Sequence, residues 1–169
     1  MTDSGQPPQP PPFRVGTGFD VHAFAPGRPL VLGGVRIPSD LGLLGHSDAD
    51  ALIHAICDAI LGAVAEGDLG QHFPDTDPRW KDCDSTVLLA QCAAIAAARG
   101  YRVGNVDVMV MAEEPRLAPH VQAMRRRIGE VLGVSADCVG VKATTMEKMG
   151  FVGRGEGIAV NAVVLLHRA

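Results

Sequence analysis

Residues 49–65 read ADALIHAICDAILGAVA, and their apolar side chains fall on nearly every side of a helix. A helix at a protein surface keeps one polar face, so this pattern is typical of a helix buried among other elements. Its polar side chains, Asp50, His54 and Asp58, lie four residues apart and form one stripe. Such a stripe needs partners from neighbouring elements. Ser47, three residues before Asp50, predicts a capping box at the helix start.

The segments on either side of this helix alternate between strands and helices. Hydrophobic periodicity predicts strands at 13–24, 101–112, 139–143 and 158–166, a hairpin at 29–37, and helices at 85–99 and 117–132. The segments 66–82 and 144–157 are rich in glycine and polar residues, so we expect loops there. This order predicts an α+β fold (α/β sandwich), with one mostly four-stranded sheet packed against a helical layer in a ferredoxin-like arrangement.

Length and composition limit the class of protein. The chain has 169 residues, 47% of them hydrophobic, which fits one compact domain. Residues 1–12 are rich in proline and nearly free of large apolar side chains, so we expect a disordered tail before a domain at 13–169. The net charge is −4, and no basic run exceeds Arg125-Arg126-Arg127, which argues against a nucleic-acid partner.

The sequence also bears on cellular location. No apolar run reaches the roughly 18 residues that suggest a membrane span, and the N-terminus lacks the order of a signal peptide. We therefore expect a cytoplasmic protein with no membrane partner. The four cysteines form no C-x-x-C pair, and we expect reduced thiols in a chain of this size.

Three residues have the chemistry of a metal site. Asp20 and His22 lie two apart on the predicted strand 13–24, so both side chains leave the same face. With His54 they offer one carboxylate and two imidazoles, which suit Zn²⁺ with a fourth tetrahedral position left open. An open position indicates catalysis rather than a structural site. Each histidine alone could equally be a hydrogen-bonded core or surface residue.

Other polar segments are compatible with ligand binding. The block at 142–157 carries hydroxyls, a carboxylate, Lys and Arg among glycines, so it could hold phosphates or be a solvated loop. The segment 112–120 joins a strand end to a helix start, where ligand pockets occur, but an ordinary capped connection fits it too. The segment 73–78 supplies carboxylates near a histidine, or a network of tight turns without a ligand.

Five motifs taken in order resemble one enzyme family. They are GFDVH at 18–22, LGHSDAD at 44–50, GDLG at 67–70, FPDTDP at 73–78, and the block at 142–157. Together they resemble the 2-C-methyl-D-erythritol 2,4-cyclodiphosphate synthases, and the likeness spans about residues 13–167. Each motif is weak by itself, but five at compatible spacing are specific.

The resemblance implies a reaction, an assembly and two metals. The family converts 4-diphosphocytidyl-2-C-methyl-D-erythritol 2-phosphate to 2-C-methyl-D-erythritol 2,4-cyclodiphosphate and CMP, by metal-assisted attack of the 2-phosphate on the β-phosphate, in the non-mevalonate isoprenoid pathway. A single catalytic domain at 13–169 and a homotrimer with active sites between subunits are therefore expected. By motif position, Asp20, His22 and His54 are the implied Zn²⁺ ligands, and Glu147 the implied ligand of Mg²⁺ or Mn²⁺.

The same motif positions imply further site residues. His46 and Thr145 match positions of transition-state stabilisation, and we take them as the implied catalytic residues. The implied substrate-binding residues are Asp20, Val21, His22, His46, Ser47, Asp68, Leu69, Gly70, Phe73, Pro74, Asp75, Thr76, Asp77, Ala112, Arg116, Leu117, Ala118, Ala143, Thr144, Thr145, Glu147, Phe151 and Arg154. In this assignment 112–118 and 143–145 contact the cytidine, whereas 68–77 face the methylerythritol.

Two other functions fit the same residues. A zinc-dependent hydrolase of a small phosphorylated substrate would place water at the open zinc position and would need a general base beside it. A non-catalytic nucleotide-binding module would contain a structural metal ion, and its fold would then depend on that ion.

Overall fold

The computed structural model describes residues 11–169, so most of the expected tail, residues 1–10, lies outside the described residues. The end of this proline-rich segment contacts the domain. Tyr101 Oη donates to the Pro11 carbonyl over 2.8 Å, and the Arg168 amide donates to the Pro12 carbonyl over 2.9 Å. These two bonds tie the start of the described chain to two strands of the sheet.

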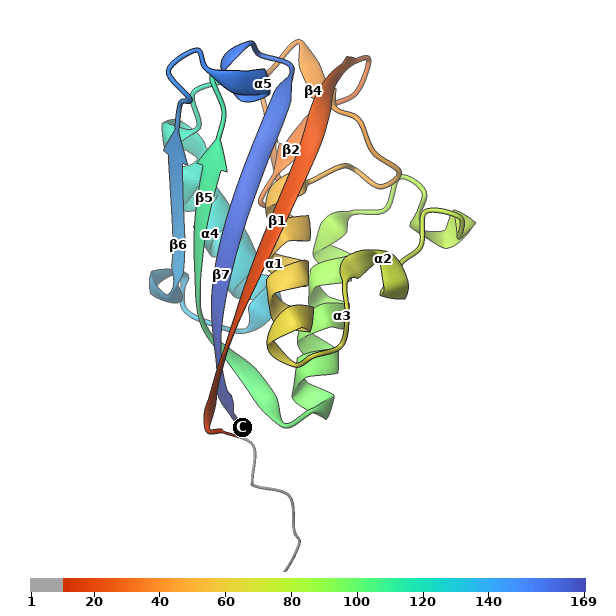
Figure 1. Cartoon of the computed structure of the whole chain (residues 1–169), viewed down its shortest axis with the longest axis vertical. Helices are drawn as coiled ribbons and strands as arrows, with labels where there is room; N and C mark the ends of the chain where they lie inside the picture. The colour runs from red at the N-terminus through yellow and green to blue at the C-terminus, as the bar shows by residue number, and fades with distance from the viewer. Residues whose placement is uncertain (1–10) are drawn as a thin grey trace, which may run out of the picture.

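The main sheet has five strands in the order β4-β1-β7-β5-β6 (Figure 1). Their bounds are β4 (Leu41–Leu43), β1 (Phe13–Pro26), β7 (Gly157–Arg168), β5 (Tyr101–Met111) and β6 (Val139–Thr144). β5 and β6 are parallel, and the other neighbours are antiparallel. The prediction of an α+β fold is confirmed, but a mostly four-stranded sheet is wrong by one strand. β4 has only three residues with a glycine in the middle, too short for a periodic signal.

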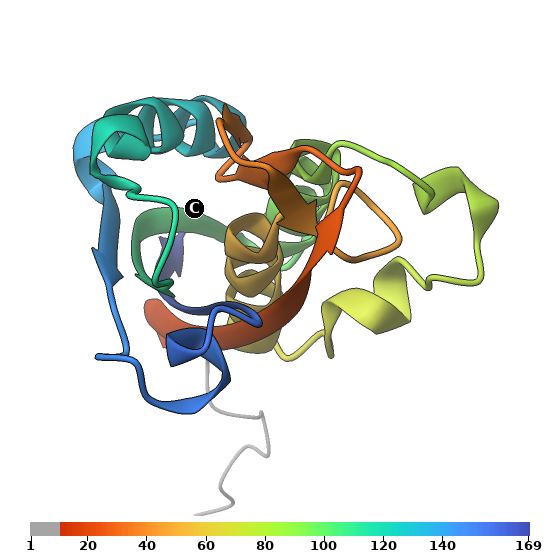
Figure 2. The ribbon, with the colours of Figure 1, turned by 90° about the horizontal axis from the view of Figure 1, so that it is seen from above.

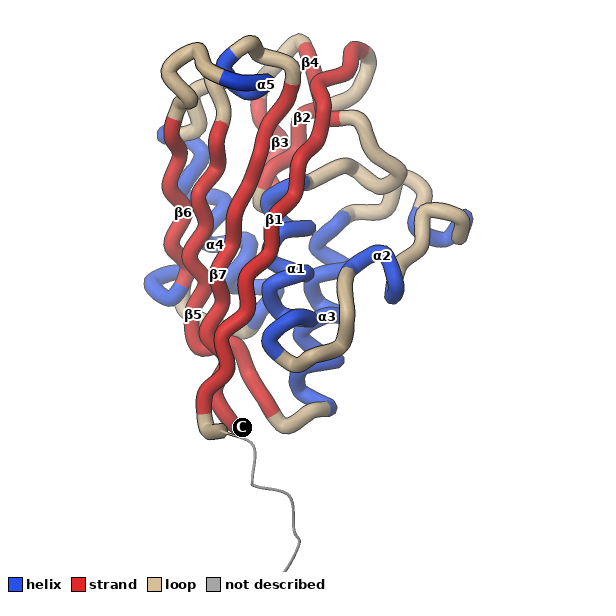
Figure 3. The backbone as a smooth tube through the Cα atoms, in the orientation of Figure 1, coloured by secondary structure: helices blue, strands red, loops and turns tan. Residues whose placement is uncertain are grey.

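The predicted hairpin is a separate two-stranded sheet of β2 (Leu30–Leu32) and β3 (Val35–Ile37). The helices are α1 (Ala51–Ala63), α2 (Leu69–His72), α3 (Ser85–Ala98), α4 (Val121–Leu132) and α5 (Gly150–Gly153), with 3-10 turns at Pro78–Trp80, Ala118–His120 and Ala136–Cys138. Figures 2 and 3 show α1, α3 and α4 on one side of the sheet. The expected loops at 66–82 and 144–157 therefore contain short helices. None of the helices in residues 11–169 has the length and apolar content that crossing a bilayer requires.

β1 packs directly on the backbone of α1. A Cβ atom at Gly16 would lie 1.8 Å from the Ala59 carbonyl oxygen, and one at Gly18 would lie 2.0 Å from the Ala55 carbonyl oxygen. Glycine is required at both positions because a methyl group would overlap the helix. All α1 residues except Asp58 and Gly62 are buried, as its sequence predicts. This close approach brings the side chains of β1 that follow Gly18 to the middle of α1.

The start of α1 differs from the expected capping box. Asp50, not Ser47, is the N-cap, and its carboxylate accepts from the Ile53 amide over 3.0 Å. The same carboxylate accepts from the amides of Gly33 and Gly34, so the β2–β3 turn is fastened to the helix start. Asp50 is fully buried, and burial raises the pKa of its carboxyl although these amides act against the shift.

Candidate metal centre and substrate cavity

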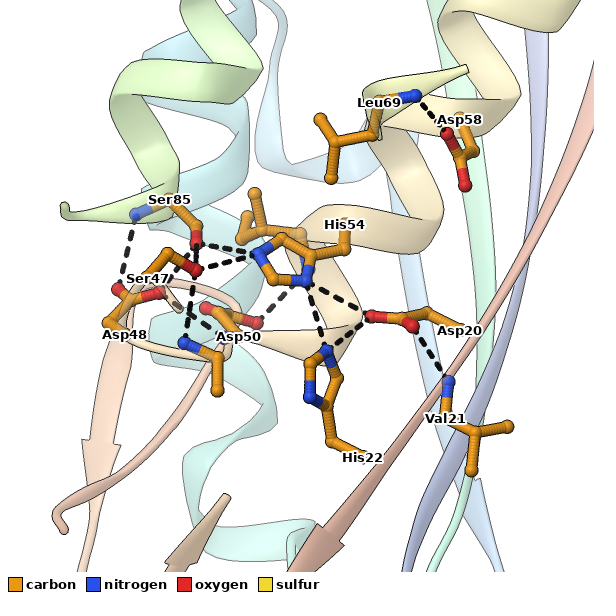
Figure 4. A network of polar contacts seen from close by, with 12 residues as sticks. Asp20, Val21, His22, Ser47, Asp48, Asp50, His54, Asp58, Leu69 and Ser85 are labelled. Atoms are coloured by element: carbon orange, nitrogen blue, oxygen red, sulfur yellow. Dashed lines mark hydrogen bonds and ion pairs between the residues drawn. The ribbon is translucent and has the colours of Figure 1, made fainter. Parts of the chain in front are cut away.

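Asp20 and His22 of β1 and His54 of α1 point toward one another (Figure 4). Asp20 Oδ2 lies 2.9 Å from His22 Nε2 and 3.1 Å from His54 Nδ1, and the two ring nitrogens are 3.3 Å apart. Each residue offers one donor atom, and the three atoms all lie within 4.8 Å of one another. The structure thus confirms that the trio predicted from the sequence comes together.

Neighbouring groups orient both imidazole rings. His22 Nδ1 donates to the Leu44 carbonyl over 2.5 Å, so Nε2 is the ring nitrogen that can bind a metal ion. On the far side of the His54 ring, Nε2 lies 3.1 Å from Ser47 Oγ and 2.9 Å from Ser85 Oγ. Hydrogen bonds at the outer nitrogens are what metal-binding histidines use to fix ring orientation and tautomer.

Hydrogen bonds within the trio favour the ionised form of the Asp20 carboxyl. Burial alone would raise the pKa of the Asp20 carboxyl, but hydrogen bonds from His22 and His54 outweigh it and hold this pKa well below its usual range. Burial would likewise lower the pKa of His22, yet the bond to Asp20 raises it above the usual value. Asp20 is therefore ionised at neutral pH and ready to act as an anionic ligand.

The donor set fits a divalent metal ion. One carboxylate and one imidazole from β1 and a second imidazole from α1 converge, the ligand types of three-ligand sites in catalytic zinc proteins. The ligands come from a long paired strand and a buried helix, so the chain itself holds them in place. If these side chains only packed the core, there would be no reason for three titratable groups to meet at one point. Nor would their side chains keep exposures of 11% to 23%.

A cavity of about 180 Å³ opens beside the trio. Its wall contains His22, His46, Ser47, His54, Leu69, Phe73, Asp75, Trp80 and Leu88. Seven of these were singled out in the sequence as metal or substrate residues. Trp80 and Leu88 were not, and only their aromatic or apolar character beside a polar loop could have indicated them.

Other predicted substrate residues within 68–77 stabilise turns. Asp68 is the N-cap of α2 and accepts from the Gln71 amide and side chain. Asp77 is the N-cap of the following 3-10 turn, and its carboxylate is bonded to Arg79. These contacts hold the pKa of each carboxyl below its usual range. Asp68 is exposed and Asp77 half-buried, and neither lies on the cavity wall. Gly70, Pro74 and Thr76 also lie outside this wall.

The predicted nucleotide residues gather elsewhere, at the ends of β5 and β6. The Ala112 amide donates to the Thr144 carbonyl over 3.0 Å, and Thr145 Oγ1 donates to Glu147 Oε1 over 2.8 Å. β6 is three strand spacings from β1, roughly 14 Å at about 4.8 Å per spacing. A single chain therefore does not bring Glu147 to the Asp20 trio.

The remaining predicted residues take several positions. Val21 points to the opposite face of the sheet, and its amide donates to Asp20 Oδ1 over 2.8 Å. Leu117 and Ala112 are buried, whereas Ala143 and Thr144 are exposed. The others are Arg116 and Ala118 before α4, with Phe151 and Arg154 in and after α5.

Residues 13–167 match the model of the YgbB family. The chain belongs to this family. A relative from Bacillus cytotoxicus, 2-C-methyl-D-erythritol 2,4-cyclodiphosphate synthase, is 58% identical over 156 residues, which cover 92% of this chain and 99% of the relative. The family membership implied by the five motifs is thus confirmed.

Solved structures agree with this assignment. The bifunctional IspDF from Campylobacter jejuni matches with a TM-score of 0.90 and 44% identity, over 93% of this chain and 42% of that longer chain. A CDP-bound 2C-methyl-D-erythritol-2,4-cyclodiphosphate synthase matches with a TM-score of 0.83 and 38% identity, over 90% of this chain and 99% of the other. These two structures thus share the fold of this chain.

Proposed function

We propose that this chain is a 2-C-methyl-D-erythritol 2,4-cyclodiphosphate synthase with its single catalytic domain at residues 13–169. It converts 4-diphosphocytidyl-2-C-methyl-D-erythritol 2-phosphate to the cyclic diphosphate and CMP in the non-mevalonate isoprenoid pathway. The observation that carries the proposal is the convergence of Asp20, His22 and His54 in a chain 58% identical to a synthase that the match covers over 99% of its length. We also propose that the sheet and helices follow a ferredoxin-like arrangement.

The reaction places modest demands on acid–base groups. An oxygen of the substrate's 2-phosphate attacks the β-phosphorus, the new P–O bond closes the ring, and the bond from the β-phosphorus to the bridging oxygen of CMP breaks. Because the nucleophile is already ionised, the protein has to supply proximity and charge neutralisation rather than a strong base. A hydrolase would instead require a base next to a water molecule, and the 58% identity to a synthase disfavours that alternative.

Two groups of this chain's residues would hold the metals. Asp20, His22 and His54 suit Zn²⁺, and the exposed Glu147 carboxylate suits Mg²⁺ or Mn²⁺, which usually keeps few protein ligands. When bound, these ions supply positive charge to the phosphates of the substrate. His46 and Ser47, on the cavity wall beside the trio, donate hydrogen bonds to phosphate oxygens in this proposal.

The two ends of the substrate are assigned to different segments. The methylerythritol end lies in the cavity beside the trio, against Leu69, Phe73 and Asp75. The cytidine end lies at the ends of β5 and β6, where Thr144 and Thr145 offer hydroxyl and backbone groups. Strands β7 and β5 lie between these regions, which supports a site shared by two subunits.

The sheet face that α1 does not cover supports an assembly. Along β1 it presents Phe13, Val15, Phe19 and Val21, with exposures from 41% to 67%, and β7 adds the exposed Val163. A contiguous apolar patch on a sheet is typical of an interface. A closed ring of three copies would cover this face and set the trio of one subunit beside the β5 and β6 ends of the next. We propose such a homotrimer.

Phosphorus NMR of the product tests the proposed reaction. The zinc- and Mg²⁺-loaded protein is incubated with the CDP-linked 2-phosphate substrate, and we expect CMP and a cyclic diphosphate to appear in equal amounts. Release of CMP with an open-chain product would identify a hydrolase instead. Binding of the substrate without any turnover would favour the nucleotide-binding module.

A further inference from the structure

The Glu113 side chain lies beneath the exposed loop that follows β6. Its Oε1 accepts from the backbone amides of Met146 over 3.0 Å and Lys148 over 3.3 Å, and its Oε2 lies 2.9 Å from Lys148 Nζ. Only 8% of the Glu113 side chain is exposed, against 81% for Lys148. One nearly buried carboxylate thus holds both neighbours of Glu147.

The backbone that these bonds hold is an unusual one. Glu147 has a φ of 51° and Lys148 a φ of 64°, in the left-handed region that residues other than glycine seldom adopt. Two such residues in a row persist only where surrounding contacts outweigh the strain. In this conformation the Glu147 carboxylate turns back to the loop and accepts from Thr145 Oγ1 over 2.8 Å.

Strand register, rather than the loop itself, sets the position of Glu113. β5 and β6 are parallel, with Met111 opposite Thr144, so the loops after both strands leave the sheet at the same end, at the top of Figure 1. The Ala112 amide closes the ladder by donating to the Thr144 carbonyl. Glu113 follows at once, which places its carboxylate against the next turn of the neighbouring loop. Ligands of open sheets bind at this end of parallel strands.

We propose that Glu113 is a positioning residue, which holds the loop 145–148 so that the Thr145 hydroxyl and the Glu147 carboxylate face the substrate's phosphates and their metal ion. The inference rests on the proposed function, because it takes the roles of Thr145 and Glu147 from there. Glu113 acts through the Met146 and Lys148 amides. Its ion pair with the exposed Lys148 ammonium is secondary, since exposed pairs contribute little.

Four variants separate these contributions. Glu113→Ala removes every contact, Glu113→Gln keeps an oxygen that can accept from both amides, and Lys148→Met removes only the ion pair. Glu130→Gln changes the same charge at an exposed position of α4 and serves as the control. For each zinc-loaded variant we would measure hydrogen exchange at the Met146 and Lys148 amides, the affinity for Mn²⁺ in the presence of CDP, and kcat and KM.

For Glu113→Ala we expect the two amides to exchange at least about tenfold faster, and Mn²⁺ affinity and kcat to fall about 10- to 100-fold, the range for groups that orient a metal ligand. Zinc content and the thermal midpoint should stay near those of the wild type. Glu113→Gln and Lys148→Met should stay within about threefold of wild type, because the amide bonds remain. Such a rescue by Gln would support a role through geometry.

Three results would overturn the proposal. One is unchanged amide exchange and Mn²⁺ affinity in Glu113→Ala. Another is a Gln variant as impaired as the Ala variant, because charge rather than the amide contacts would then matter. The third is a loss of activity that only follows a loss of zinc or of folded protein. If the wild type makes no cyclic product, the proposed function fails, whereas amide exchange and Mn²⁺ affinity still decide the role of Glu113.

Discussion

The Ser85 hydroxyl lies 2.9 Å from His54 Nε2 and donates to Asp48 Oδ1 over 2.5 Å. An ionised carboxylate only accepts, so the single hydroxyl proton of Ser85 goes to Asp48 and its lone pairs are free to accept. His54 therefore donates from Nε2 when its Nδ1 lone pair binds a metal ion. The chain from His54 through Ser85 to Asp48 fixes the tautomer that the site needs.

Ser85→Ala should lower zinc affinity by about tenfold, the mild end of the range for such outer contacts, because Ser47 Oγ still lies 3.1 Å from Nε2. Competition with a chromogenic chelator measures the affinity. Ser39→Ala removes a hydroxyl from an exposed loop and is the control. Equal affinities in the two variants would show that Ser85 does not support His54.

Removing zinc should leave the fold intact. Asp20 and His22 sit on a strand paired with β7 along eleven residues, and His54 belongs to a helix buried in the core. Chelated protein and His54→Ala should therefore keep their circular dichroism while losing activity. Unfolding on chelation would instead favour a structural metal in a nucleotide-binding module.

Glu147→Gln should leave zinc content normal, lower turnover, and raise the Mg²⁺ concentration needed for half-maximal rate. The amide can still accept from Thr145, so the loop keeps its shape and only the charge is lost. A Mg²⁺ titration of the variant beside the wild type is the measurement. Coincident titration curves would make Glu147 an ordinary loop residue.

Gly18→Ala should cost about 3 kcal/mol or more in the free energy of unfolding, at or above the upper end of the usual range for overpacking. The added methyl would meet the Ala55 carbonyl, which is backbone and cannot rotate away. Gly62→Ala is the matched substitution on α1, where the added methyl would lie 3.9 Å from the Thr17 carbonyl oxygen, and it should gain up to about 1 kcal/mol from helix propensity. Urea unfolding measures both. Equal midpoints would contradict the close β1–α1 contact.

The Asp20–His22 pair was predictable from local geometry, whereas its grouping with His54 followed from the resemblance to the family. Alternation along one strand puts Asp20 and His22 on the same face, and His54 stands out as a polar residue on an apolar helix. The roles of Ser85 and Asp48 were not predictable, since the contact of Ser85 with His54 depends on how α3 packs on α1. No periodicity within one element carries that information.

The prediction of Ser47 as the cap of α1 was wrong for a related reason. Ser47 and Asp50 are both good N-cap residues, and the sequence pattern does not choose between them. The choice depends on the Gly33–Gly34 turn, whose amides bind the Asp50 carboxylate, and on His54, which draws the Ser47 hydroxyl away. Both determinants come from distant segments. The distance between Glu147 and the trio likewise depends on strand order. It could not be predicted before the sheet showed that β7 and β5 lie between β1 and β6.

That separation leads to a prediction about mixed subunits. If the zinc half of one subunit works with the nucleotide half of its neighbour, subunits damaged in different halves should complement each other. One variant carries His54→Ala, and the other carries Thr144→Ala together with Thr145→Ala. Each parent alone should be nearly inactive, because every interface in it has one defective half.

After denaturation and refolding of an equal mixture, random assembly joins an intact zinc half to an intact nucleotide half at roughly a quarter of interfaces. Activity should therefore return to about a quarter of the wild-type value. Sedimentation and mass spectrometry of differently tagged subunits must first show that mixed trimers formed. Wild type refolded in the same way gives the reference, which corrects for losses on refolding. Mixed trimers that stay as inactive as their parents would place both halves in one chain, and the Asp20 trio would then need another partner for the substrate's phosphates.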